Sequence, residues 1–252
     1  AMAYNEQTGL VDIFGGMQDI QRNVVRCVGD AKERFTEDAL RMMRAVRFSA
    51  QLGYQIEEGT KKAIRSMAPN LHLISAERIQ AELVKLVISP HPDYLRTAYE
   101  TGITAQILPE FDLCMETAQN NPHHCYNVGE HILHAMQEIE ADKVLRLGML
   151  FHDIGKPQTL TIDEAGIIHN KGHADAGERI AKDVLRRLKF DNDTLEKVVK
   201  LVRYHDQEIG LTASGVRRAV NRIGEDIFPM LFAVRYADIQ AQSNYMREEK
   251  LE

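Results

Sequence analysis

Residues 36–52 read TEDALRMMRAVRFSAQL, and this stretch decides the fold because its apolar residues recur at helical spacing. The apolar residues that share one face of the predicted helix are Ala39, Met42, Met43, Val46 and Ala50. Thr36 suits the N-cap of this helix, and Gly53 suits its C-terminal cap. The stretch therefore predicts an amphipathic helix over residues 36–52 with one buried face.

The flanking sequence has the same character. A second helix is predicted over residues 75–88, with Ser75 as its N-cap and Pro90 beyond its end. Its inward residues are Ile79, Leu83, Leu86 and Val87. Strand signals are scarce, because aromatic residues make up 6% of the chain and Trp is absent. The predicted fold class is all-α, with at most a short β element near residues 10–13.

The composition limits the class of protein. A chain of 252 residues with 44% hydrophobic and 27% charged residues can form one large or two small globular domains, which excludes a disordered chain. No segment approaches the ~18 consecutive apolar residues of a membrane span, and the start AMAYNEQTGL has no features of a secretion signal. The three cysteines form no C-x-x-C pair, so they indicate neither a disulfide framework nor a cysteine zinc site. We expect a soluble, cytoplasmic protein without a membrane partner.

Charge is unevenly distributed along the chain. The formal net charge is -6, but residues 21–65 hold ten Lys or Arg residues against six acidic ones. A basic segment within an acidic protein indicates a phosphate-bearing partner, although an ordinary solvated helix face is the alternative. The polar stretch QNNPHH at 119–124 contains an Asn-Pro pair and is the predicted domain boundary.

Histidine and aspartate residues gather in the second half of the sequence. They occur in the segments GEHILHAM, LGMLFHDIGKP, NKGHADAG, LVRYHD and VRYADIQ as His131, His152, Asp153, His173, His205 and Asp238. Imidazole and carboxylate groups are ligands for divalent cations, and a metal ion would satisfy several polar groups on inward helix faces at once. A satisfied core or surface histidine is the alternative at each single position. Because Gly155 and Pro157 follow the His-Asp pair, we expect the pair at an exposed helix end that is open to substrate.

These residues resemble the pattern of HD-domain phosphohydrolases, a family named for its H…HD…D metal ligands. The resemblance implies that His131, His152, Asp153 and Asp238 bind metal, and that His173 and His205 are the additional histidines of members with a second metal ion. It also implies that Lys156 meets phosphate. His152, Asp153 and Lys156 are then the catalytic residues, and metal-bound water attacks phosphorus. The metal in this site is expected to be Mg, Mn, Ni, Fe or Zn.

The predicted helix over residues 36–52, which lies in the basic segment, offers a second candidate site. Asp38 and Arg41 are three residues apart, so they are neighbours on one helical face, and Arg44 and Arg47 continue the series. An Asp beside an Arg can pair with the Watson–Crick edge of a base, while further arginines suit its phosphates. From chemistry alone, ion pairing within the helix is the favoured alternative.

A second resemblance concerns this same helix. The strings ERFTEDALRMMRAVRFSAQLGY and SAERIQAELVKLV resemble the nucleotide-selecting helix and neck of class II tRNA nucleotidyltransferases, the CCA-adding enzymes, and of bacterial poly(A) polymerases. The similarity covers roughly residues 1–110. It implies that Asp38 and Arg41 act as a protein template for CTP or ATP, supported by Arg44 and Arg47, and that tRNA is the second substrate. VDIFGGMQD resembles the flexible motif between the family's head and neck.

The sequence departs from this family at one point. Family members transfer nucleotides with a head domain whose Asp-x-Asp pair holds two Mg ions, whereas the D-x-D of this chain, Asp191 to Asp193, precedes Thr194 and is predicted to be a helix cap. AMAYN resembles the end of a head segment, so we expect a fragment without the head. The predicted domains are 1–30 (head remnant and linker), 31–118 (helical neck and body), 119–245 (HD domain) and 246–252 (tail).

Three functions are compatible with these patterns. The first is a head-less part of a CCA-adding nucleotidyltransferase, which matures tRNA 3′ ends, fused to an HD-type metal-dependent phosphohydrolase. The second is a self-sufficient HD phosphohydrolase acting on a nucleotide or cyclic phosphate, or a relative of poly(A) polymerase. The third is a non-catalytic RNA-binding module. The sequence alone leaves the oligomeric state and the choice among CCA, CC, A and poly(A) addition open.

Overall fold

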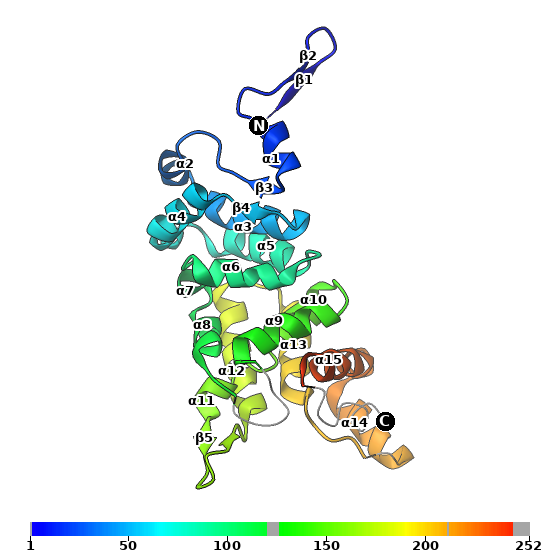
Figure 1. Cartoon of the computed structure of the whole chain (residues 1–252). Coiled ribbons are helices and arrows are strands. Elements are labelled where there is room, and N and C mark those ends of the chain that lie inside the picture. Colours follow the sequence, from blue (N-terminus) through cyan, green and yellow to red (C-terminus); the bar gives the residue numbers. More distant parts are fainter. Residues whose placement is uncertain (1, 120–125, 211, 244–252) are drawn as a thin grey trace. The chain divides into compact units, whose positions relative to one another are not determined.

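The computed structural model describes residues 2–119, 126–210 and 212–243, and the chain divides into two compact units, Ala1–Ile107 and Leu108–Glu252. Helices build both units, and the strands of the described residues form three two-stranded pairs (Figure 1). The prediction of an all-α fold is confirmed. None of the described helices is long and apolar enough to cross a membrane.

The first unit begins with a hairpin and continues as a stack of short helices. Its elements are β1 (Ala3–Asn5), β2 (Gly9–Val11), α1 (Gly16–Gln21), β3 (Val24–Val25), α2 (Ala31–Glu37), α3 (Leu40–Leu52), β4 (Gln55–Ile56), α4 (Glu58–Met67), η1 (Ala68–Leu73), α5 (Ala76–Val87), η2 (Pro92–Tyr94), α6 (Leu95–Glu100) and α7 (Thr104–Ile107). β1 and β2 pair antiparallel, with Tyr4 opposite Leu10, so the strand element expected near residues 10–13 overlaps β2. β3 and β4 form a parallel pair that the sequence did not predict.

The stretch 36–52 differs from the prediction at its beginning. Two helices cover it, because Asp38 has extended backbone angles and separates α2 from α3. Thr36 is therefore not an N-cap; it lies inside α2, where its hydroxyl donates to the carbonyl of Lys32. Asp38 Oδ1 accepts a hydrogen bond from the amide of Leu40, the first residue of α3, while Ala39 occupies the N-cap position.

The buried faces of α3 and α5 are those expected. Helices α3 and α5 pack against each other. Met42 and Val46 of α3 are 0% and 1% exposed, and Leu83 and Val87 of α5 are both 0% exposed. Gly53 ends α3 with φ 68°, a left-handed conformation that favours glycine at this C-cap. Ser75 occupies the N-cap of α5 as predicted.

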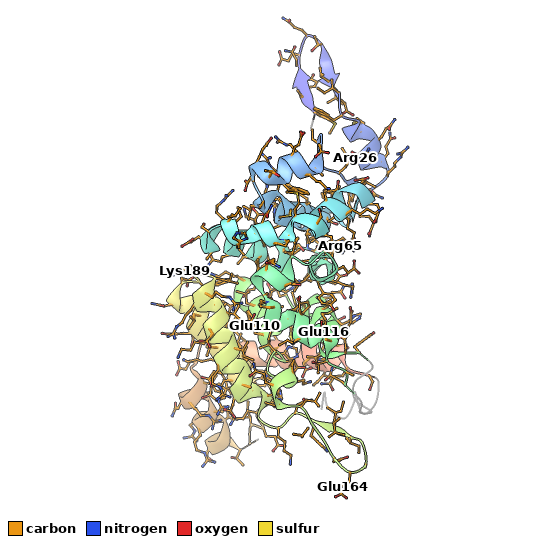
Figure 2. All side chains as sticks on the ribbon, turned by 90° about the vertical axis from the view of Figure 1, so that its left-hand side faces the viewer. Arg26, Arg65, Glu110, Glu116, Glu164 and Lys189 are labelled. Atoms are coloured by element: carbon orange, nitrogen blue, oxygen red, sulfur yellow. The ribbon has the colours of Figure 1, made fainter. Side chains whose placement is uncertain are left out.

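The second unit is a helical bundle with one hairpin. Its elements are α8 (Pro109–Glu116), α9 (Val128–Glu138), α10 (Lys143–Phe151), α11 (Lys156–Thr159), β5 (Thr161–Ile162), β6 (Ile168–His169), α12 (His173–Arg187), α13 (Asn192–Tyr204), α14 (Ala213–Ile223) and α15 (Phe228–Ala241). The hairpin β5–β6 was also not predicted, and Glu164 lies at its tip, away from the helices of this unit (Figure 2). Asp191 caps α13, as predicted, by accepting hydrogen bonds from the amide and hydroxyl of Thr194.

The two compact units of the structure meet between Ile107 and Leu108, while the predicted functional domains stay a prediction. Helix α8 belongs to the second unit, because Arg187 of α12 binds both carboxylate oxygens of Glu110 at 2.7 and 2.8 Å. Asn127 also donates to the carbonyl of Met115, which joins α8 to the beginning of α9. Residues 120–124 of the predicted boundary lie outside the described residues.

Candidate metal centre and nucleotide pocket

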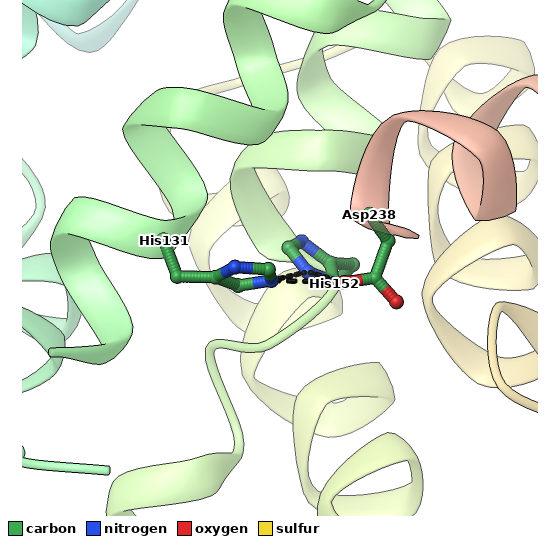
Figure 3. Close-up of side chains that lie close together, drawn as sticks. All are labelled: His131, His152 and Asp238. Atoms are coloured by element: carbon green, nitrogen blue, oxygen red, sulfur yellow. Dashed lines mark hydrogen bonds and ion pairs between the residues drawn. The ribbon is translucent and has the colours of Figure 1, made fainter. Parts of the chain in front are cut away.

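Three helices of the second unit bring the first group of predicted metal ligands together. His131 comes from α9, His152 is the C-cap of α10, and Asp238 comes from α15 (Figure 3). His131 Nε2 lies 2.9 Å from Asp238 Oδ1 and 3.3 Å from His152 Nε2. One ligand atom from each residue lies within 4.8 Å of the others, which is the spacing of side chains that share one cation.

A second group lies beside the first. Asp153, His173 at the beginning of α12 and His205 after α13 also have ligand atoms within 4.8 Å of one another. His173 Nε2 lies 3.2 Å from His205 Nε2 and 3.5 Å from Asp153 Oδ1. The structure thus brings all six predicted metal ligands into one region of the second unit.

Asp153 connects the two groups through its two oxygens. Its Oδ2 lies 3.3 Å from His152 Nε2 and 3.5 Å from His131 Nε2 in the first group. Its Oδ1 lies 3.5 Å from His173 Nε2 and 3.9 Å from His205 Nε2 in the second. This carboxylate therefore faces both histidine groups, an arrangement that the spacing in the sequence did not predict.

The segment HDIGKP forms a buried turn. His152 and Asp153 are 0% and 2% exposed, so the expected exposed helix end is wrong. The reason is the packing of α12 over the turn: a Cβ on Gly155 would lie 2.1 Å from the carbonyl oxygen of His173. Only glycine allows this approach, which brings His173 to the metal cluster. Pro157 lies in the first turn of α11 and so begins a helix.

Backbone carbonyls orient three of the imidazoles. The Nδ1 atoms of His152, His173 and His205 lie 2.7, 3.0 and 2.8 Å from the carbonyl oxygens of Met149, Asn170 and Val202. A carbonyl can only accept, so each Nδ1 carries the proton and, in the neutral ring, each Nε2 presents a lone pair to the centre of the cluster. Facing lone pairs on His173 and His205 suit a shared cation, and this donor chemistry fits divalent metal ions.

The electrostatics of the cluster favour positive charge. Burial opposes protonation of His152, but the charges and hydrogen bonds of Asp153 and Asp238 outweigh it and raise the pKa of His152 to about 10. Burial, aided by the charge on His152, lowers the pKa of His205 to about 4. The two carboxylates therefore attract a cation, whether a proton or a metal ion, and metal binding must displace the added proton of His152.

Lys156 is buried beside the metal cluster. Its Nζ lies 2.6 Å from Asp153 Oδ2 and donates to Gln119 Oε1 at 2.9 Å. Contact of this lysine with phosphate, which the resemblance implies, stays a prediction. Asp206 is a further neighbour that the sequence analysis missed, with Oδ2 3.6 Å from His173 Nε2. The signal was present, because His205 and Asp206 repeat the His-Asp doublet.

The first unit contains a pocket of about 350 Å³ over the basic helices. Arg34 of α2 and the predicted residues Arg41 and Arg44 of α3 line it together, next to Phe48. Glu37 Oε2 accepts hydrogen bonds from the Nη1 atoms of both Arg34 and Arg41 at 2.5 Å. These bonds, the one from Arg41 most strongly, lower the pKa of Glu37. Glu37 therefore holds two guanidinium groups at the rim of the pocket.

Asp38 and Arg47 have partners distant in sequence and do not line this pocket. Asp38 Oδ2 accepts from Arg78 Nη2 of α5 at 2.8 Å, because the break between α2 and α3 separates this carboxylate from Arg41. Arg47 Nε donates to Glu82 Oε2 at 2.5 Å, and both side chains are close to 10% exposed. The structure brings Arg41 and Arg44 together in one pocket, while Asp38 and Arg47 join α3 to α5.

Comparisons with known proteins match different parts of the chain. A family model described as a probable RNA and SrmB-binding site of polymerase A matches residues 53–115, and an HD-domain model matches residues 123–239. An A-adding tRNA nucleotidyltransferase of Deinococcus radiodurans is 32% identical over 96% of this chain and 57% of its own length. A CC-adding tRNA nucleotidyltransferase of Thermus thermophilus is 33% identical over 93% of this chain and 56% of its own length.

A solved structure resembles the chain over almost its whole length. The CCA-adding enzyme of Bacillus stearothermophilus in complex with CTP matches with a TM-score of 0.66 and 26% identity, over 99% of this chain and 54% of that protein. The chain thus spans just over half the length of these relatives.

Proposed function

The chain belongs to the class II tRNA nucleotidyltransferase family and carries an HD domain, and on this premise we propose that it selects nucleotides for tRNA 3′-end maturation. The observation that carries this proposal is the pocket lined by Arg34, Arg41 and Arg44. Its volume of about 350 Å³ is within the range of small-molecule sites. The proposed substrates are CTP, ATP and tRNA, and a tRNA substrate would place the protein in the cytoplasm.

Nucleotide recognition would use the remaining donors of Arg41 and the carboxylate of Asp38. Arg41 binds Glu37 and the carbonyl of Arg34 through Nη1 alone, so its Nε and Nη2 atoms can donate to a nucleotide while these bonds persist. Asp38 Oδ1 accepts from the amide of Leu40 and Oδ2 from Arg78, and each oxygen has a second lone pair for a base edge. We propose that Asp38 and Arg41 recognise the base edge, that Arg44 supports the nucleotide, and that Arg47 supports it indirectly by fixing α3 against α5.

Nucleotide binding is the direct test of this proposal. Calorimetric titration of the 252-residue chain with CTP and with ATP should show binding that Arg41→Ala weakens. No binding of either nucleotide would refute the selecting role. The names of the relatives include A-adding and CC-adding enzymes, so the ratio of the two affinities would also indicate which nucleotide this chain selects.

A second function is proposed for the HD domain. The six-residue cluster supports metal-dependent hydrolysis of phosphomonoesters or 2′,3′-cyclic phosphates. A divalent cation bound there would stabilise negative charge on the phosphoryl oxygens as a Lewis acid. One cation would be held by His131, His152 and Asp238, and a second cation by His173 and His205. Asp153 would contact both cations. Lys156 would fix the orientation of Asp153, and imidazole ligands are compatible with Ni, Fe and Zn as well as Mn or Mg.

Activity measurements separate this pair of functions from the alternatives. Hydrolysis of a 2′,3′-cyclic nucleotide that needs added metal and is lost in His152→Ala, together with CTP or ATP binding, supports both proposals. Hydrolysis without nucleotide binding would favour a self-sufficient phosphohydrolase. Salt-sensitive tRNA binding with neither nucleotide binding nor hydrolysis would favour an RNA-binding module.

A further inference from the structure

A second pocket lies next to the arginine-lined pocket in the first unit. It has a volume of about 520 Å³ and lies between the beginning of α2 and α4. The two pockets share Arg26, Cys27 and Thr60, and the amide of Cys27 donates to Thr60 Oγ1 at 3.0 Å. A ligand long enough to fill both pockets would therefore pass over this common wall, which Arg26 helps to form.

The acidic side chains of the second pocket are already engaged. Asp30 caps α2 by accepting from the amide of Glu33 at 2.9 Å. Glu57 caps α4 and accepts from both the amide and the hydroxyl of Thr60. Although burial acts in the opposite direction, these hydrogen bonds lower the pKa of Glu57, so it remains an anion. Both carboxylates thus satisfy helix ends and offer little to a cationic ligand.

The cationic side chains of this pocket are differently placed. Arg26 forms an ion pair with Asp19. Lys32 of α2 and Lys62 of α4 are exposed on opposite helices of the pocket, and among the residues that the structure describes neither has an ion-pair partner. Two ammonium groups without partners therefore flank a space of nucleotide size, which favours an anionic ligand.

The lining of the pocket distinguishes among anionic ligands. Among its lining residues there is no aromatic ring on which a base could stack. Recognition there must act on phosphate and sugar groups. The space is much larger than one phosphate ion, and it continues from the pocket that holds Arg41 and Arg44. A polynucleotide backbone has phosphates at regular spacing and fits both features better than a free anion does.

We infer that the pocket between α2 and α4 binds backbone phosphates of the RNA strand whose 3′ end is extended, with Lys32 and Lys62 as its phosphate-binding residues. This inference rests on the proposed function and adds a position for the RNA next to the nucleotide pocket. Lys62 lies within the matched RNA-binding family model, whereas Lys32 lies outside it, so the inference extends the RNA contact to α2.

The test measures RNA affinity as a function of salt. Fluorescence anisotropy with a labelled tRNA would compare the 252-residue chain with Lys32→Gln/Lys62→Gln. Loss of two phosphate contacts should lower the slope of log K against log salt by about 1.4 to 1.8. The RNA affinities of the two proteins should become equal near 1 M salt, whereas at 0.1 M salt the variant should bind RNA about 25- to 60-fold more weakly. Lys32→Arg/Lys62→Arg should keep the wild-type slope.

Two controls make the result specific. Lys182→Gln/Lys189→Gln removes the same charge from exposed lysines that line neither pocket and lie outside residues 53–115, and should leave the slope within about 0.5 of wild type. CTP and ATP binding should be unchanged in Lys32→Gln/Lys62→Gln, because Arg34, Arg41 and Arg44 are intact. Thermal unfolding of each variant should match the wild-type protein.

The possible outcomes separate this inference from the proposed function. Wild-type RNA binding with an unchanged slope in Lys32→Gln/Lys62→Gln would overturn the inference and leave the proposed function standing. Pyrophosphate binding that is lost in this variant without any effect on RNA would assign the pocket to a free anion and would also overturn it. An equal loss of RNA and CTP binding in Lys32→Gln/Lys62→Gln would show that the two pockets act as one nucleotide site, and would overturn the inference. A wild-type chain that binds neither CTP, ATP nor tRNA would remove both proposals.

Discussion

The two units hold their candidate functional groups in opposite ways. In the second unit, His131, His152 and Asp153 are at most 2% exposed, and backbone carbonyls orient the histidine rings before any ligand arrives. In the first unit, the arginines around the pocket are partly exposed, and Arg34 and Arg41 are tied to Glu37. The buried cluster is preorganised for a cation, whereas the arginines of the basic pocket are held by ion pairs that water can reach.

The difference predicts different responses to mutation. Removing one member of the buried cluster leaves the others desolvated and unpaired, so the effect should be large and should concern metal binding. Removing one exposed arginine leaves groups that water can solvate, so the effect should be smaller and should concern nucleotide affinity.

The largest effect is expected for Asp153→Asn. Because one carboxylate faces both histidine groups, this variant should bind no metal ion, while His173→Ala should keep the ion of the first group. Metal analysis after gel filtration in metal-free buffer gives the stoichiometry. His134→Ala is the matched control, since this half-buried histidine stacks on Tyr126 and is not among the six ligands. An equal number of bound metal ions per chain in Asp153→Asn and His173→Ala would contradict the proposal that Asp153 contacts both cations.

The next effect concerns stability of the first unit. Arg47→Ala should lower the free energy of unfolding by about 3 kcal/mol, because it leaves the carboxylate of Glu82 buried without its main partner. Urea denaturation followed by circular dichroism measures the change. Arg47→Met combined with Glu82→Leu should recover most of the loss, since an apolar pair of similar volume needs no counter-charge. A full loss in this double variant would show that the ion pair itself is required.

A smaller effect is expected for Arg41→Ala. Loss of a charge-assisted hydrogen bond of about 1.5 to 3 kcal/mol should weaken CTP or ATP binding by about 10- to 150-fold. The unfolding free energy should change little, because Arg41 is 31% exposed and its partner Glu37 is 51% exposed. Arg22→Ala removes an exposed arginine that does not line the pocket and should bind nucleotide normally. Equal affinity in Arg41→Ala and Arg22→Ala would exclude Arg41 from the site.

The smallest effect is expected at a helix cap of the second unit. Asp191→Ala should lower the unfolding free energy by about 1 kcal/mol, because α13 loses its N-cap. Hydrogen bonds from the amide and hydroxyl of Thr194 lower the pKa of Asp191 from 3.8 to about 2. Its contribution should therefore be complete above pH 3.8 and disappear as the pH falls toward 2.

Comparing wild type with Asp191→Ala by urea denaturation between pH 2 and 7 tests this dependence. Asp193→Ala provides the control, since Asp193 is 72% exposed and bonds only Lys197 among the contacts of the described residues. A stability difference that stayed constant down to pH 2 would argue against the capping carboxylate as its source.

Part of this structure was predictable because periodicity records burial within a single helix. The inward residues of α3 and α5, the cap at Gly53 and the cap at Asp191 all depend on neighbours within a few positions. The six metal-ligand candidates were also found from the sequence, because buried polar residues in apolar helical segments need a shared partner.

Other features depended on residues far apart in the sequence. Asp38 pairs with Arg78, 40 positions away, and Arg47 with Glu82, 35 positions away, so the expected pairing of Asp38 with Arg41 did not form. The short strands β3 and β4 were missed for a related reason: two residues each carry no periodicity, and they exist only through pairing with each other.

The sequence by itself determined which helix faces are buried and which residue types are present for metal and nucleotide chemistry. Only the tertiary structure decided that Asp153 faces both histidine groups, that Gly155 permits the approach of His173, and that Asp38 separates two helices. The physical reason is the distance along the chain over which each interaction acts. Helical periodicity and capping act over about four residues, whereas the partner of a charged side chain is set by how distant helices pack.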